Sequence, residues 1–201
     1  MDKPAKADYP IHDLLKVRWS PRAFSDRTVE PDKLCTLLEA VRWAPSSFNE
    51  QPWSFIIATK EDKPEFDRLL SCLVEGNIAW AQHAPVLMLS VAKLFFEKNG
   101  KENRHAFHDV GLAVENLVIQ ATALGLTVHQ MAGFHVEKAR ELFGIPERYE
   151  PVAAMAIGYP GDPESLPPQL RERESGPRTR KSLQEFAFTG RWGQVSPLVR
   201  P

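Results

Sequence analysis

A short stretch near the start of the chain, "KVRWSPRAFSDRTV", gathers basic residues around two serines and two aromatic residues. Arg18, Ser20 and Arg22 point to the same side of an extended segment, because side chains alternate with a period of two. Two guanidinium groups beside a hydroxyl form a good site for a phosphate or another delocalised anion. The alternative interpretation, which spacing alone favours, is a solvated loop whose arginines pair with Asp26 and Glu30.

A second polar cluster, "APSSFNEQPW", is bounded by Pro45 and Pro52, which restrict its backbone. Ser47, Asn49 and Gln51 line this loop, and the two amides each carry both a donor and an acceptor. Such groups suit the edge of a heterocycle that presents both kinds of partner, as a flavin pyrimidine does. A capped turn is an equally good explanation, because Ser and Asn are common in turns.

The elements that must position these two segments can be predicted from the apolar pattern. Helical spacing, with proline and glycine at the ends, predicts helices over residues 11–19, 31–44, 63–76, 105–124 and 136–144. Apolar runs rich in β-branched residues predict strands over residues 53–59, 85–93, 126–132 and 152–159. This order of elements predicts a layered fold of the mixed α/β or α+β class.

We expect residues 1–201 to form a single domain, in which residues 160–201 are an extended tail. The tail begins polar and proline-rich, which is typical of a segment that runs over the surface. It ends in an apolar block that contains Leu183, Phe186 and Trp192. A disordered tail would not normally carry these residues together, so we expect the block to dock, on a second subunit.

The bulk composition narrows the class of partner. The chain has 25 basic and 26 acidic residues, which argues against nucleic-acid binding. Because no apolar run is long enough for a bilayer span or a signal peptide, we expect a cytoplasmic protein with no membrane partner. Cys35 and Cys72 have no spacing typical of a disulfide framework or a zinc site. His105, His108 and Asp109 share the start of one helix, but exposed or interface histidines explain them better than a metal does.

Five segments together resemble the nitroreductase-like flavoproteins. They are "RWSPRAF", "LLEAVRWAPSSFNEQPWSFIIAT", "DVGLAVENLVIQATALGL", "HQMAGF" and "PRTRKSLQEFAFTGRWG". They follow in family order from about Leu14 to Trp192, and five ordered motifs are far more specific than one. The resemblance implies a central, mostly antiparallel sheet flanked by helices, and an FMN bound at the interface of a homodimer.

The resemblance also implies roles for particular residues, and the family that the chain resembles needs no metal. The cofactor-binding set that it implies is Arg18, Trp19, Ser20, Arg22, Ser47, Asn49, Gln51, Met131, Ala132, Gly133, Arg178 and Arg180. Arg18 and Ser20, with the two tail arginines, match the positions around the FMN phosphate and ribityl chain. Arg22 matches the position at the pyrimidine ring, and Gly133 lies in the backbone segment beside flavin N5. "QMAGF" carries no acidic residue, so the source of any proton stays open.

The activity that the resemblance implies is an NAD(P)H oxidoreduction with FMN, in which a nitroaromatic, a quinone or a similar small molecule accepts the electrons. The chain lacks a G-x-G-x-x-G motif, so we expect NAD(P)H to visit the flavin transiently and give ping-pong kinetics. One alternative is a protein of the same fold that binds, stores or modifies flavin without NAD(P)H turnover. Another is a phosphate- or nucleotide-binding protein without flavin.

Overall fold

Four antiparallel strands form one sheet in the order β1-β2-β4-β3, in a computed structural model that describes residues 3–199. The strands are β1 (Trp53–Thr59), β2 (Val86–Lys93), β3 (Thr127–Met131) and β4 (Tyr149–Gly158). The helices are α1 (Asp13–Val17), α2 (Pro31–Arg42), α3 (Lys63–Leu70), α4 (Glu75–Ala81), α5 (Ala106–Ala123), α6 (Val136–Phe143) and α7 (Pro168–Ser175). The predicted layered fold, with its antiparallel sheet flanked by helices, is confirmed.

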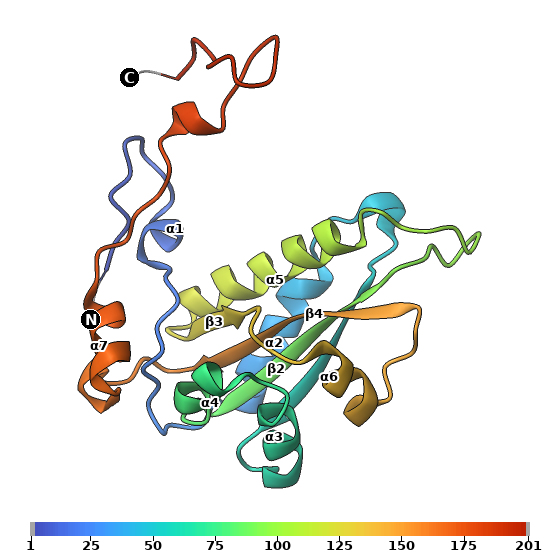
Figure 1. The fold of residues 1–201 in the computed structure, drawn as a ribbon, viewed down its shortest axis with the longest axis vertical. Coiled ribbons are helices and arrows are strands. Elements are labelled where there is room, and N and C mark those ends of the chain that lie inside the picture. Colours follow the sequence, from blue (N-terminus) through green and yellow to red (C-terminus); the bar gives the residue numbers. More distant parts are fainter. Residues whose placement is uncertain (1–2, 200–201) are drawn as a thin grey trace.

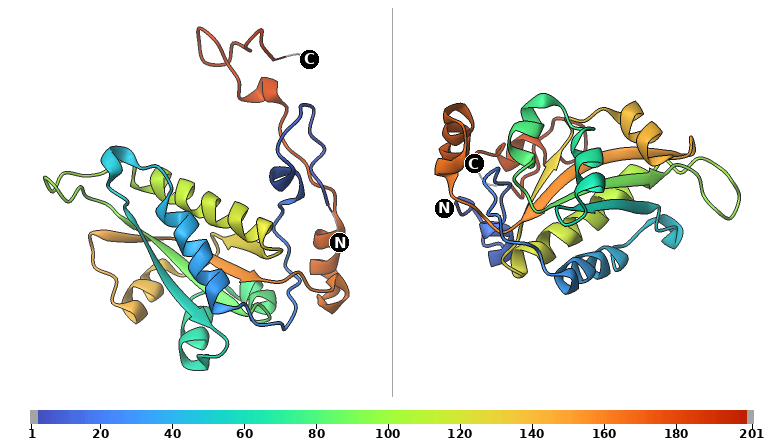
Figure 2. Two further views of the ribbon diagram at one scale, coloured as in Figure 1. Left: turned by 180° about the vertical axis from the view of Figure 1, so that it is seen from behind. Right: turned by 90° about the horizontal axis from the view of Figure 1, so that it is seen from below.

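Helices cover both faces of the sheet (Figure 1; Figure 2, right). α2 and α5 pack on one face, in a core that includes Met88 of β2. α3, α4 and α6 pack on the other face, in a core that includes Leu87 and Leu89. Alternate side chains of β2 thus enter different cores, and only Lys93 at its end is not fully buried. This explains why β2 is a continuous apolar run instead of an alternating one.

α5 is the central helix, and it is buried on more than one side, as its apolar pattern predicts. α2 lies along it, and the Asn116 side chain of α5 donates a hydrogen bond to the carbonyl of Ala40 in α2. Gly125 follows the helix in the left-handed region, with φ of 73°. Glycine adopts this conformation at little cost, which explains the sharp end of α5.

One predicted helix, residues 63–76, is wrong in its extent. The chain forms two helices there, α3 and α4, separated at residues 71–74. In this break Leu73 makes an antiparallel bridge with Phe134, and the amide of His135 donates to the carbonyl of Cys72 at 2.7 Å. Pairing with the loop after β3 uses backbone groups that a continuous helix would have needed, so tertiary contacts override helical propensity.

The tail after β4 is not extended throughout. α7 interrupts the segment that was predicted to run over the surface, and Pro168 starts it at a position that proline favours. Beyond α7, residues 177–199 lead away from the sheet beside the N-terminal segment (Figure 1; Figure 2, left). Trp192 near the end of this tail is 93% exposed. Docking of the tail on a second subunit stays a prediction.

Candidate functional site

The alternation of the basic segment before α2 predicts that Arg18, Ser20 and Arg22 share one side, and the structure shows such a contact only for Arg18 and Ser20. Arg18 Nη1 donates to Ser20 Oγ at 3.3 Å, so the two side chains share one side. Arg22 instead lies against α7, with its Nη1 3.8 Å from Glu174 Oε2. In the described residues neither Arg18 nor Arg22 forms the alternative ion pair with Asp26 or Glu30, and Arg27 is the arginine of this stretch that pairs with Glu30.

Glu30 is engaged by other groups. Arg27 Nη2 donates to its carboxylate at 2.6 Å, and the Tyr159 hydroxyl donates to it at 2.6 Å. The hydrogen bond from Tyr159 is the main reason that the pKa of Glu30 is lowered to about 2, with its own backbone and Arg27 adding to the effect. Arg27 is thus paired with Glu30 at the surface, whereas Arg18 has no such carboxylate partner in the described residues.

The backbone of the basic segment is held by side chains from β3 and α4. His129 Nδ1 lies 3.0 Å from the carbonyl of Pro21. Because a carbonyl only accepts, Nδ1 carries the proton. Trp80 is 1% exposed and packs between His129, at 4.5 Å between ring centroids, and Phe24, at 6.3 Å. These contacts fix where the segment can place its arginines.

His129 makes folding stability depend on pH. Burial, assisted by the positive charge of Arg22, lowers the pKa of His129 from 6.5 to about 4. Between these values the unfolded chain binds a proton that the folded chain does not, so stability falls as pH falls. We expect the free energy of unfolding to drop by about 2 kcal/mol from His129 between pH 7 and about pH 5. Urea denaturation of the parent and of His129→Asn measures this, and equal losses in both would contradict it.

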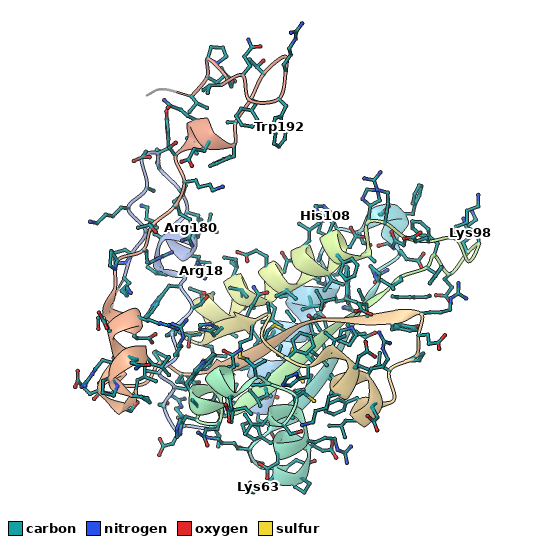
Figure 3. The ribbon with its side chains drawn as sticks, viewed as in Figure 1. Arg18, Lys63, Lys98, His108, Arg180 and Trp192 are labelled. Carbon is teal, nitrogen blue, oxygen red and sulfur yellow. The ribbon has the colours of Figure 1, made fainter. Side chains whose placement is uncertain are left out.

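Three of the predicted arginines meet at one cavity. Arg18, Arg178 and Arg180 line an open pocket of about 1000 Å³ between the N-terminal segment, α1 and the tail. Figure 3 shows Arg18 and Arg180 close together at the carboxyl end of α5. Burial first, and then the charges of the other two arginines, lower the pKa of Arg178. None of the three forms an ion pair with any carboxylate of residues 3–199.

Arg178 has a structural role as well. Its Nη1 donates to the carbonyls of Lys3, at 2.5 Å, and of Lys16, at 3.0 Å, and so ties the tail to the N-terminal segment. Trp19 is half-buried, and the Lys3 ammonium lies 4.9 Å from its ring centroid. The indole thus has a cation as its neighbour, and the cofactor-binding role that the resemblance implies for Trp19 stays a prediction.

The end of β3 and the loop after it pack against the core and α4. Met131 is buried in the core that also contains Ala23, the neighbour of Arg22. The carbonyl of Gly133 accepts from Asn77 Nδ2 at 2.9 Å, and a Cβ at residue 133 would lie 2.7 Å from that nitrogen. A side chain at residue 133 would therefore displace Asn77 of α4 and disturb its hydrogen bond, a contact that the sequence did not indicate. Ala132 is exposed.

The Ser47–Gln51 loop is strained. Phe48, Asn49 and Gln51 all have positive φ, between 51° and 57°, which is uncommon for residues other than glycine. The loop is fixed by the buried carboxylate of Asp109, which accepts from the amide of Ser47 at 2.9 Å. Strained backbone that the surroundings maintain is concentrated at functional sites, and here it presents two exposed amide side chains.

One chain does not bring all of the predicted residues together. Asp109 holds the Ser47–Gln51 loop at the first turn of α5, whereas Arg18 lies at the other end of that helix (Figure 3, where His108 marks the amino end). The helix has 18 residues, so about 25 Å separates its ends. Within one chain, the Ser47–Gln51 loop and the arginines of the pocket are therefore separate groups.

Some residues that contact the predicted site residues have no clear signal in the sequence. Glu174 is one charge in a polar run, and Asn77 belongs to no motif. Asp109 was considered only as a metal ligand, although the central-helix pattern contains it. His105 and His108 are exposed, and residues 3–199 contain no group of three or more His, Cys, Asp or Glu arranged to hold a metal.

Comparison with known proteins identifies the family of this chain. The family model described as "Nitroreductase family" matches residues 15–159. A solved structure described as an oxidoreductase containing FMN is 36% identical, with a TM-score of 0.88, and the match covers 93% of this chain and 95% of that one.

Two curated proteins extend the comparison. An uncharacterized 15.4 kDa protein of Mycolicibacterium smegmatis is 39% identical over 128 residues, which is 64% of this chain and 84% of the relative. The FMN reductase (NAD(P)H) of Bacillus subtilis strain 168 is 28% identical over 169 residues, which is 75% of this chain and 66% of the relative. Since the family model spans most of the chain and both sheet faces, the chain belongs to the nitroreductase family.

Proposed function

We propose that this protein is an FMN-dependent NAD(P)H oxidoreductase that reduces nitroaromatic, quinone or similar small acceptors. Its cofactor is FMN, on which the family match, the FMN-containing structure and the FMN reductase relative agree. The observation that carries the proposal is the pocket with three arginines that have no carboxylate partner in residues 3–199.

The phosphate end of FMN fits this pocket. Arg18, Arg178 and Arg180 offer donors and positive charge to a dianion, and Ser20 adds a hydroxyl beside Arg18. Arg178 retains its Nε and second terminal nitrogen for such a contact, because the hydrogen bonds to backbone carbonyls use Nη1. The arginines come from the N-terminal third and from the tail of one chain.

The ring end of FMN is assigned to Arg22 and the loop after β3. Arg22 would stabilise the negative charge that develops at N1 and C2=O on reduction. The backbone of Ala132 and Gly133 would lie beside N5. His129 is neutral near pH 7, and its Nδ1–H donates a hydrogen bond to the carbonyl of Pro21. In this proposal water or the substrate therefore supplies any proton.

A homodimer completes the site in this proposal. The Ser47–Gln51 loop of the partner would approach the arginines of the pocket, and Asn49 and Gln51 would contact the flavin. Phe48 in this loop is 91% exposed, and the tail carries the exposed Trp192. Burial of these side chains against the partner would remove apolar surface from water.

When bound, FMN supplies the hydride and electron chemistry, while the chain supplies binding, orientation and charge. NAD(P)H and the acceptor would bind one after the other at the same open face of the flavin, which predicts ping-pong kinetics.

The activity is tested by NADH and NADPH oxidation with menadione or nitrofurazone as acceptor. We expect turnover with parallel lines in double-reciprocal plots. A yellow protein that oxidises neither nucleotide would instead be a flavin-binding or flavin-modifying protein, and a colourless one that fails to bind added FMN would exclude a flavin role.

The shared site is tested by co-expressing Arg18→Ala with Asn49→Ala. If each site uses both chains, the heterodimer has one intact site and holds more FMN than either homodimer. Equal FMN content in all three would contradict a site built from two chains.

A further inference from the structure

Glu174 in α7 is a buried acid whose contacts converge on Arg22. The residue is 1% exposed. Its Oε1 accepts from the backbone amides of Arg22, at 2.8 Å, and Ala23, at 3.2 Å. Its Oε2 has no hydrogen-bond partner in residues 3–199 and lies 3.8 Å from Arg22 Nη1. Acidic residues are almost never fully buried without a partner. Only one of the two carboxylate oxygens of Glu174 accepts hydrogen bonds, so its negative charge is not explained by the amides alone.

A neutral side chain could cap the same two amides. An amide oxygen accepts two hydrogen bonds as a carboxylate oxygen does. The carboxylate adds a negative charge in the interior, at 3.8 Å from one terminal nitrogen of Arg22. The Arg22 side chain keeps 26% of its surface exposed, so its guanidinium is not enclosed by this contact.

We propose that Glu174 is the positioning residue for Arg22, and that it sets how much of the positive charge of Arg22 acts on the cofactor. This inference rests on the proposed function, which places Arg22 at the flavin ring. Oε1 holds the peptide groups of residues 22 and 23, and Oε2 attracts the guanidinium from the protein side. The charge of Glu174 therefore offsets part of the stabilisation that Arg22 gives to the reduced ring.

Two substitutions distinguish the hydrogen bonds that Glu174 accepts from the backbone amides from the effect of its negative charge. Glu174→Gln keeps an acceptor oxygen and removes the charge, so we expect the midpoint potential of bound FMN to become more positive. Arg22→Ala should shift it in the opposite direction. Glu174→Ala removes the acceptor, so hydrogen exchange at the amides of Arg22 and Ala23 should accelerate at least about tenfold in FMN-free protein, whereas Glu174→Gln should keep most of their protection.

The matched control is Glu172→Gln, which removes an exposed charge from the same helix and should leave both the potential and the exchange as in the parent. The inference is overturned if Glu174→Gln leaves the potential unchanged or makes it more negative. It is also overturned if the two amides exchange in Glu174→Ala as they do in the parent. If Glu174→Ala does not fold, the potential of Glu174→Gln decides.

Failure of the proposed function is distinguishable from failure of this inference. A parent protein that binds no FMN would defeat the proposed function, while amide exchange would still report whether Glu174 holds the segment. A parent that binds FMN and a Glu174→Gln variant with an unchanged potential would defeat the inference alone.

Discussion

Replacement of Arg18 by alanine is expected to release most of the bound FMN. Arg18 lines the pocket, forms no ion pair with a carboxylate of residues 3–199, and is oriented by Ser20. A charge-assisted hydrogen bond contributes about 1.5–3 kcal/mol, so the affinity for FMN should fall by roughly ten- to a hundredfold. Titration of the FMN-free variant, followed by the quenching of flavin fluorescence, measures the change.

Arg27→Ala is the matched control, because Arg27 belongs to the same basic stretch but is bound to Glu30 at the surface. It should bind FMN as the parent does. If both variants lost FMN equally, a general effect of positive charge would replace a specific contact. If Arg18→Ala retained full affinity and colour, the assignment of the phosphate to this pocket would be wrong.

Replacement of Trp80 by alanine should destabilise the fold more than replacement of His129 or Trp43. Trp80 is 1% exposed and packs against Phe24, which belongs to the basic segment, and against His129, which contacts that segment at Pro21. Removal of a buried aromatic side chain costs about 3–5 kcal/mol, since the core closes the cavity only partly. Urea denaturation at one fixed protein concentration measures the loss, because the stability of an oligomer depends on concentration.

The control for Trp80 is Trp43→Ala. Trp43 is 75% exposed, and its indole donates one hydrogen bond, to Glu39. Such a surface substitution should change stability by no more than about 0.5 kcal/mol. A loss for Trp80→Ala as small as this would show that the basic segment does not depend on α4 for its support.

Regular periodicity is what made much of the fold predictable. α5 was expected over residues 105–124 and spans Ala106–Ala123, because its apolar positions recur at helical spacing and Gly125 ends it. The break between α3 and α4 was not predicted, because it depends on Leu73 pairing with Phe134, far away in the sequence. A local pattern carries no information about such a pairing.

In the candidate site, too, local patterns were predictable and contacts between distant residues were not. The shared side of Arg18 and Ser20 follows from the period of two and is seen in their contact. The partner of Arg22 could not be predicted, because Glu174 lies 152 residues away in a run of charges with no apolar stripe. Nor does a phenylalanine at residue 48 suggest left-handed backbone, which Asp109 and the rest of the loop maintain.

The central claim is that guanidinium groups from both ends of the chain bind the phosphate of FMN. Its most direct test compares the affinity of the FMN-free protein for FMN and for riboflavin, which differ only in that phosphate. With Arg18, Arg178 and Arg180 as ligands, we expect FMN to bind at least about a hundredfold more tightly, and salt to reduce the difference. Equal affinity for the two flavins, at low and at high salt, would contradict the claim.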